Sequence, residues 1–220
     1  MRVLLINPNT RRETTAMMAE LARRYGPAHW EWLTLTAEQG ESLIADPQAL
    51  ATAAEAVAGM HAQITALNVD AVIVAAFGDP GLEALRTTLA VPVVGIGEAA
   101  MRAADALAQP FALITITPQL RESTLAQLRR YGCESHLRAL LVAEGDARTT
   151  AQNPQHLVER VQACMRQAID EQGAQVLVIG GGPVAAAAQQ LGRSAGVRTI
   201  LPLQAAVERV EALLAGSARP

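Results

Sequence analysis

The chain has 220 residues, half of them apolar, and a formal net charge of −3 from 18 basic and 21 acidic side chains. That length suits one domain or two small ones, and the charge balance leaves no basic patch for a phosphate backbone, which argues against a nucleic-acid partner. No apolar run approaches the roughly 20 residues that span a bilayer, and the N-terminus enters a strand directly, unlike a signal peptide. We therefore expect a cytoplasmic protein without a membrane partner.

Short apolar runs alternate with amphipathic helical stretches along the chain, and such runs suit strands buried on both faces of a parallel sheet. The expected strands are Val3–Ile6, His29–Leu35, Ala71–Ala76, Val91–Ile96, Phe111–Thr115, Leu137–Val142 and Val176–Ile179. The expected helices are Thr14–Tyr25, Ala49–Leu67, Leu82–Leu89, Glu98–Leu107, Glu122–Tyr131, Leu157–Glu171, Val184–Leu191 and Leu203–Leu214. This alternation predicts βαβ units and an α/β fold.

An internal repeat runs through the chain. The strand, Gly/Pro turn and helix that begin at Ala71 recur from Val176, so that Ala76 matches Gly181 at an offset of 105. Upstream, Asn7-Pro8 aligns with Thr117-Pro118, and each copy ends its helix on Arg-Arg-Tyr-Gly. The repeat predicts two pseudo-symmetric lobes, each with a mainly parallel sheet flanked by helices.

The expected lobes are residues 1–108 and 109–202, with the C-terminal helix in 203–220 packing back onto the first. No Ser/Gly linker separates them, so we expect a rigid connection and a ligand site in the cleft between the lobes. A pair of lobes related in this way offers a ligand equivalent loops from opposite sides.

Four strand-to-helix turns form the candidate site, because ligands of open α/β sheets bind beyond the carboxyl ends of the strands. Backbone N–H groups at such turns suit a carboxylate, an imide oxygen or an enolate. For each turn alone, capping and tight backbone geometry would explain the same residue types. The repeat favours a shared site, whose expected lining is Asn9, Ala76, Phe77, Gly78, Asp79, Thr117, Gly181 and Gly182.

Three segments, INPNT from Ile6, FGDPGL from Phe77 and GIGEA from Gly95, resemble the hydantoin and allantoin racemases of the aspartate/glutamate racemase superfamily. The resemblance runs over nearly the whole chain. It implies a two-lobed α/β fold and cofactor-independent racemisation of a carbon next to a carbonyl group. One thiolate of the family removes the proton on one face and a thiol on the other face returns one.

The chain departs from this pattern at both places where the resemblance puts a thiol. Ala76 precedes Phe-Gly-Asp-Pro-Gly and Gly181 stands at the matching turn, and neither side chain can exchange a proton. Cys133 and Cys164 lie away from the expected strand ends and are interpreted as structural thiols. Two-thiol racemisation is therefore not expected, and the catalytic residues are unknown.

Other titratable residues near the strand ends are Asp79, Glu98 and Arg121. Asp79 and Glu98 both begin expected helices, where a carboxylate is a good cap and a poor general base. The four histidines have no counterparts in the other lobe and are interpreted as solvated or packed. The pattern contains no nucleotide-binding loop and no metal-ligand spacing, so we expect neither a cofactor nor a metal.

The sequence thus predicts a hydantoin or allantoin racemase-like protein, in a homo-oligomer, that binds a small polar hydantoin, ureido acid or dicarboxylate. Three alternatives stay open for what happens to that ligand. The protein could use groups other than thiols, it could be a non-catalytic binding paralogue, or it could be a hydrolase or lyase that uses the Gly180–Gly182 turn to bind an oxyanion.

Overall fold

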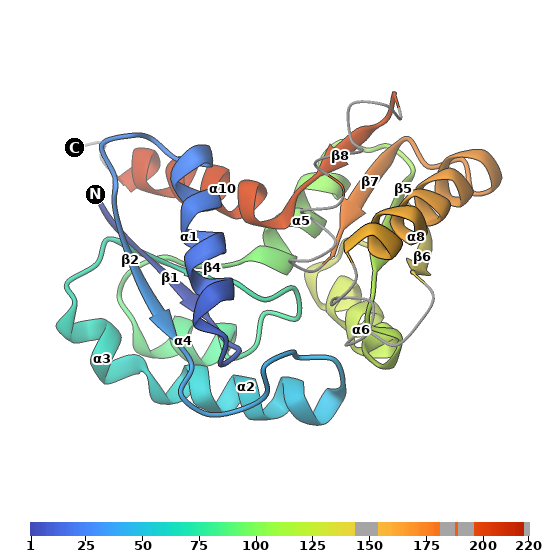
Figure 1. The fold of residues 1–220 in the computed structure, drawn as a ribbon. Coiled ribbons are helices and arrows are strands. Elements are labelled where there is room, and N and C mark those ends of the chain that lie inside the picture. Colours follow the sequence, from blue (N-terminus) through green and yellow to red (C-terminus); the bar gives the residue numbers. More distant parts are fainter. Residues whose placement is uncertain (144–153, 181–187, 189–195, 218–220) are drawn as a thin grey trace. The chain divides into compact units, whose positions relative to one another are not determined.

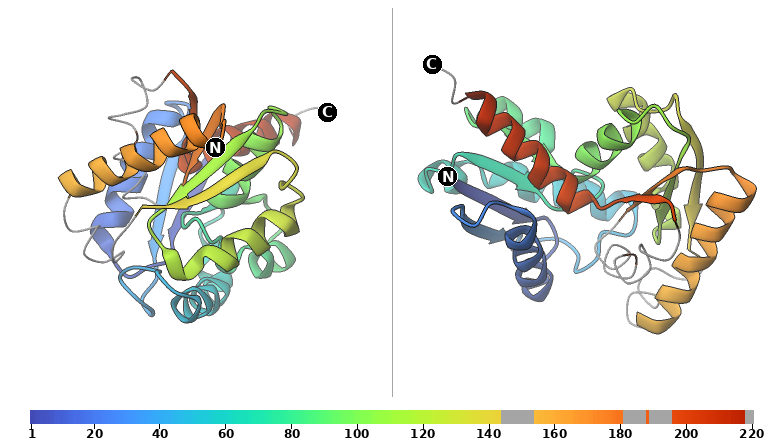
Figure 2. Two further views of the ribbon diagram at one scale, coloured as in Figure 1. Left: turned by 90° about the vertical axis from the view of Figure 1, so that its right-hand side faces the viewer. Right: turned by 90° about the horizontal axis from the view of Figure 1, so that it is seen from above.

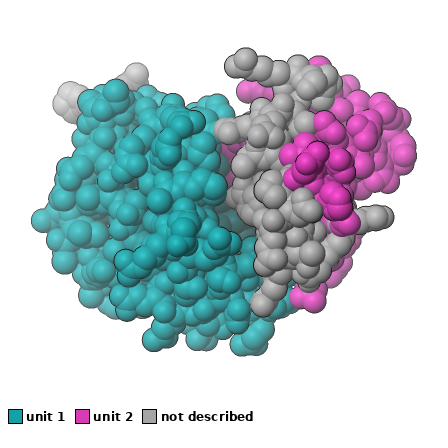
Figure 3. All heavy atoms as spheres, in the orientation of Figure 1, with its two compact units in different colours: residues 1–99, 203–220 teal, residues 100–202 magenta. Residues whose placement is uncertain are grey.

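The computed structural model describes residues 1–143, 154–180, 188 and 196–217. The described residues form two four-stranded parallel sheets flanked by helices (Figure 1). The chain divides into two compact units, Met1–Ala99 with Leu203–Pro220, and Ala100–Pro202 (Figure 3). The expected α/β class with a mainly parallel sheet in each lobe is therefore confirmed.

The sheet of the first unit has the order β2-β1-β3-β4. Its strands are β1 (Arg2–Asn7), β2 (Glu31–Thr36), β3 (Ala71–Val74) and β4 (Val93–Gly95). Its helices are α1 (Arg12–Tyr25), α2 (Pro47–Gly59), α3 (His61–Ala66), α4 (Leu82–Thr88) and α10 (Pro202–Ser217). Helix α5 (Ile96–Asp105) begins in this unit and ends in the other.

The core of the first unit follows from the alternation of side chains along the two central strands. Leu4 and Ile6 of β1 point to the face that α2, α3 and α4 cover, where they pack with Val57 and Ile64. Helix α1 packs against β1 and β2 (Figure 1). The central strands β1 and β3 are almost wholly buried, whereas the edge strand β2 is partly exposed.

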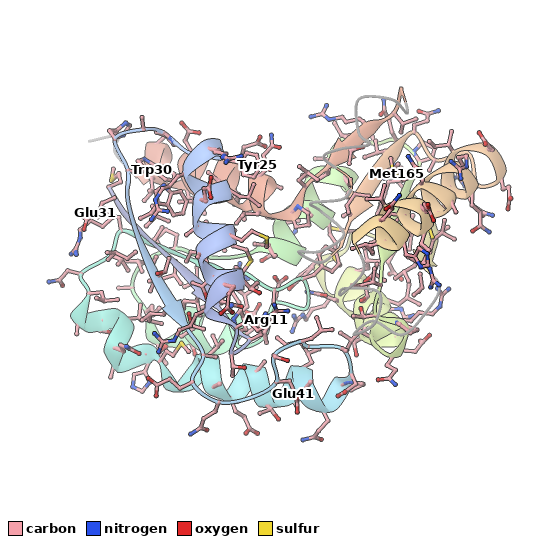
Figure 4. All side chains as sticks on the ribbon, viewed as in Figure 1. Arg11, Tyr25, Trp30, Glu31, Glu41 and Met165 are labelled. Carbon is pink, nitrogen blue, oxygen red and sulfur yellow. The ribbon has the colours of Figure 1, made fainter. Side chains whose placement is uncertain are left out.

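The second unit repeats this plan with the order β6-β5-β7-β8. Its strands are β5 (Phe111–Thr115), β6 (Leu137–Val142), β7 (Val176–Ile179) and β8 (Arg198–Ile200). Its other elements are a 3-10 turn (Pro118–Leu120), α6 (Arg121–Tyr131), α8 (Pro154–Arg166) and a π-helical turn (Gln167–Glu171). Helix α8 lies along one face of the sheet (Figure 2), and Met165, labelled in Figure 4, belongs to it. Leu157, Val161 and Met165 of this helix belong to the core of the unit.

The predicted elements differ from the observed ones in a few places. The expected helix Ala49–Leu67 is two helices, α2 and α3, divided at Met60 directly after Gly59, a residue of low helix propensity. Strand β8 was not expected, because three residues are too few to give a periodic signal. The expected helix Val184–Leu191 lies outside the described residues except for Ala188, which is helical.

The repeated Arg-Arg-Tyr-Gly sequence ends its two helices in different ways. Gly132 after α6 has φ +67° and closes the helix in the left-handed conformation. Gly26 after α1 is extended, with φ −92° and ψ 166°. Pro27 follows Gly26, and a proline disfavours helical geometry in the residue before it. The extended conformation of Gly26 agrees with the proline that follows it.

Candidate active-site loops

Each sheet has one topological switch point, where the strand order reverses. In the first sheet, β2 lies on one side of β1, and β3 and then β4 lie on the other side, so the switch point is between β1 and β3. In the second sheet, the switch point is between β5 and β7. Ligands of open α/β sheets bind outside the carboxyl ends of the strands at such points. The loops after β1, β3, β5 and β7 are therefore the candidate site of each unit.

Asn7 ends β1 and organises the loop that follows it. Its side chain is fully buried. Its Nδ2 atom lies 2.9 Å from Asn9 Oδ1, 3.0 Å from the carbonyl oxygen of Arg11 and 3.0 Å from Thr15 Oγ1. Figure 4 labels Arg11 in this loop and Glu41 in the loop that follows β2. The two loops are joined by a hydrogen bond of 3.2 Å from the Thr10 N–H to the Glu41 carbonyl oxygen.

Asn9, an expected ligand-binding residue, is half-buried and only partly used by this loop. Its Oδ1 accepts from Asn7 Nδ2 and, at 2.9 Å, from the Arg11 N–H. Its Nδ2 group donates to none of the residues that the structure describes. The loop thus fixes the amide by its oxygen and leaves the nitrogen as a donor.

Thr115 and Thr117 repeat the arrangement in the second unit. The Ala143 N–H donates to the Thr115 carbonyl at 2.8 Å, as the Ala37 N–H donates to that of Asn7 at 2.9 Å. The Thr115 and Thr117 hydroxyl groups lie 3.0 Å apart. By strand pairing, Thr117 therefore corresponds to Asn9 and not, as the aligned prolines indicate, to Asn7.

Ala76 is the second residue after β3 and lies just beyond the last hydrogen bond of the sheet. The Ala75 N–H donates to the Ile6 carbonyl at 2.8 Å, and the Gly180 N–H donates to the Ile114 carbonyl at 2.7 Å. These pairs preserve the offset of the repeat, so Gly181 follows Gly180 as Ala76 follows Ala75. Gly181 and Gly182 themselves lie outside the described residues.

A tight turn carries Ala76, Phe77 and Gly78. The Asp79 N–H closes it by donating to the Ala76 carbonyl at 2.9 Å. The N–H groups of Ala76 and Gly78 meet no acceptor in the described part of the chain. A β-carbon on Gly78 would lie 2.6 Å from Leu50 Cδ1 of α2, so this position has no room for a side chain unless Leu50 moves. Leu50 is a neighbour that no local sequence pattern indicates.

Asp79 holds its place through its side chain. It is 4% exposed, and its backbone has φ +47°. The carboxylate accepts from the Gly97 N–H at 2.9 Å and from the Glu98 N–H at 2.7 Å. Asp79 is thus a helix cap, as the sequence indicates, but it caps α5, whereas the sequence pattern pointed to the helix directly after it.

The other titratable candidates are held by structural contacts. Glu98 Oε2 lies 2.5 Å from Arg86 Nη2, and the Arg86 Nε group donates to the Val93 carbonyl at 3.0 Å. Arg121 donates to the Leu140 carbonyl of β6 at 2.6 Å. Cys133 precedes β6 at the amino end of that sheet, and Cys164 is buried in the α8 core.

The described residues also bear on metal binding and on membrane crossing. No group of three His, Cys, Asp or Glu side chains in that part of the chain is arranged to hold a metal ion. None of the helices there combines the length and apolar character that a membrane crossing requires.

Comparison with known proteins extends over nearly the whole chain. The family described as Asp/Glu/Hydantoin racemase matches residues 3–210. A hydantoin racemase of Rhizobium meliloti is 31% identical over 217 residues, which cover 97% of this chain and 89% of the relative. One of Paenarthrobacter aurescens is 28% identical, covering 98% and 92%. The allantoin racemase structure from Klebsiella pneumoniae has a TM-score of 0.91 at 32% identity, covering 99% of this chain and 89% of that one.

Proposed function

Because this chain belongs to the Asp/Glu/hydantoin racemase family, we propose that it binds a small polar hydantoin, ureido acid or dicarboxylate without racemising it through two thiols. The observation that carries the proposal is that residue 76, the first residue beyond the last hydrogen bond of the sheet at β3, has only a methyl group as its side chain. The family resemblance assigns one acid–base thiol to this position and the other to position 181, where the chain has glycine.

Removal of a proton from carbon requires a base within hydrogen-bond reach of it. The nearest carboxylate in the sequence, that of Asp79, has both oxygens bonded to the first turn of α5. Glu98 is paired with Arg86. Neither carboxylate is a good replacement for the thiol, because using it as a base would break contacts that hold the loop or the helix.

The donors that the loops leave available support the ligand class that the family resemblance suggests. Asn9 Nδ2 and the N–H groups of Ala76 and Gly78 donate to none of the described residues, and all three stand at the switch point of the first sheet. Neutral donors of this kind suit carbonyl, imide and carboxylate oxygens. The hydantoin ring, the ureido group and the dicarboxylates all present such oxygens.

Titration calorimetry combined with isotope exchange tests the proposal. The purified protein is titrated with allantoin, 5-benzylhydantoin, N-carbamoyl amino acids and aspartate, and each is then incubated with it in deuterated water. We expect saturable binding of at least one compound and no deuterium at its α-carbon above the protein-free rate. Failure of every compound to bind would refute the ligand class. Enzymic deuterium uptake would show that another group supplies the base, and a changed product mass would indicate a hydrolase or lyase.

A further inference from the structure

The β3–α4 loop is anchored to a second, distant helix terminus through one side chain. Asp79 closes the turn that carries Ala76 with its main chain and accepts two N–H groups of α5 with its carboxylate. The turn and the start of α5 are therefore a single hydrogen-bonded assembly. Helix α5 also begins directly after β4, so the assembly joins the loop to the neighbouring strand of the sheet.

The carboxylate of Asp79 is packed directly against Gly95. A β-carbon on Gly95 would lie 2.3 Å from Asp79 Oδ1 and 2.4 Å from its Cγ, so only a glycine at the end of β4 leaves room for the carboxylate. The backbone of Asp79 is in the left-handed region, which is unfavourable for a residue with a side chain. The two short hydrogen bonds to buried N–H groups offset that strain, because a charged acceptor makes the stronger bonds.

From this geometry we propose that Asp79 is a positioning residue for the candidate site, which sets the direction in which position 76 faces its ligand. The inference rests on the proposed function for what that ligand is. Asp79 does not itself contact the ligand, since its two oxygens face the first turn of α5. The turn from Ala76 to Asp79 keeps its orientation through the bonds to Gly97 and Glu98.

A thiol at position 76 makes this orientation measurable without any ligand. The native Cys133 and Cys164 are buried, so a cysteine in Ala76→Cys is the accessible thiol, and the wild-type protein gives the background. Its rate of alkylation by iodoacetamide depends on its exposure and on the fraction of thiolate, both of which the turn controls. The rate is measured against pH by intact-protein mass spectrometry.

Three substitutions are compared in the Ala76→Cys protein. Asp79→Asn removes one acceptor and places an amide against a backbone N–H. Gly95→Ala keeps the charge of Asp79 and displaces its carboxylate by contact. Asp70→Asn is the matched control, because the Asp70 carboxylate accepts from the Arg2 N–H at 2.6 Å at the opposite, amino end of β3.

We expect Asp79→Asn and Gly95→Ala each to change the alkylation rate about threefold or more, and Asp70→Asn to leave it within about twofold. Unchanged rates in both variants, with lowered melting temperatures, would show that Asp79 stabilises the fold and positions nothing. A change in Asp79→Asn alone would assign the effect to charge and overturn the proposal. Failure of both variants to fold, with a folded Asp70→Asn control, would do the same. Because no ligand is used, these outcomes are independent of whether the proposed ligand class is correct.

Discussion

Asn7 and Asn9 hold each other in a reciprocal pair. The Asn7 Nδ2 group donates to Asn9 Oδ1 at 2.9 Å, and the Asn9 N–H donates to Asn7 Oδ1 at 3.1 Å. This pair fixes the orientation of the Asn9 amide, because its oxygen faces inward to Asn7 and to the Arg11 N–H. The nitrogen of Asn9 is therefore the part of this side chain to test in ligand binding.

Asn9→Asp should weaken ligand binding by about 1–3 kcal/mol, because it keeps the acceptor that the loop uses and replaces the donor with a second acceptor. Calorimetric titration measures the change, with whichever of allantoin, 5-benzylhydantoin, the N-carbamoyl amino acids or aspartate binds the wild-type protein. Asn68→Asp makes the same chemical change at the other end of the sheet, before β3, and should leave the affinity unaltered. Equal affinities of Asn9→Asp and wild type would move the site away from the β1–α1 loop.

Thr117→Val should also weaken binding by about 1–3 kcal/mol, because Thr117 corresponds to Asn9 by strand pairing and valine lacks the hydroxyl group. The comparison uses the same titration. Thr65→Val, which removes an exposed hydroxyl group bonded to the His61 carbonyl, is the control for loss of a threonine. If only the Asn9 variant loses affinity, the second unit does not contribute this loop to the site.

The wild-type protein should not racemise 5-substituted hydantoins or allantoin, because Ala76 and Gly181 carry no acid–base group. Polarimetry of an L-hydantoin follows this directly, with a heat-denatured sample as the control for spontaneous racemisation. Decay of the optical rotation at an ordinary enzymic rate, on the order of 1–1000 per second, would mean that another base acts in this protein.

Restoring both thiols should restore chemistry. Ala76→Cys combined with Gly181→Cys should catalyse α-proton exchange of a hydantoin in deuterated water above the wild-type rate, because each thiol then stands at the turn where the family resemblance places it. The two single variants are the controls and should exchange from at most one face. A folded double variant with two alkylatable thiols and no exchange would indicate that the loops were reshaped for a different ligand.

Asn7→Ala should lower the free energy of unfolding by about 1–3 kcal/mol, because it removes the buried amide that donates to the Thr15 hydroxyl, the Asn9 Oδ1 atom and the Arg11 carbonyl. Chemical denaturation measures the change. Gln204→Ala, which removes a surface hydrogen bond to Glu208, should cost far less. A loss for Asn7→Ala no larger than that of the Gln204 control would show that the loop does not depend on this network.

The sequence predicted the parallel strands well because their signal is local. Phe111–Thr115 and Val176–Ile179 have the predicted bounds, since each is an apolar run between turn residues. Leu137–Val142 also has the predicted bounds, and its position after the second Arg-Arg-Tyr-Gly indicated it. The offset of 105 in the repeat also holds for Ala75 and Gly180, which make matching hydrogen bonds, whereas Gly181 lies outside the described residues.

Features that depend on contacts across the fold could not be predicted from the same patterns. Asp79 caps α5, 17 residues further along than the residue itself, because β4 brings the start of that helix to the loop after β3. The alignment of Pro8 with Pro118 pairs Asn7 with Thr117, whereas strand pairing matches Asn7 to Thr115, two residues earlier. In the second unit the 3-10 turn begins three residues after β5, whereas α1 begins five residues after β1.

Steric crowding around the β3–α4 loop limits how this loop can evolve. Gly78 is closed by Leu50 and Gly95 by Asp79, so neither glycine can gain a side chain without displacing a neighbour. Residue 76 stands outside both restrictions and can exchange a thiol for a methyl group while the turn keeps its hydrogen bonds. A lineage can therefore give up its chemistry at this position by a single substitution and inherit the scaffold unchanged.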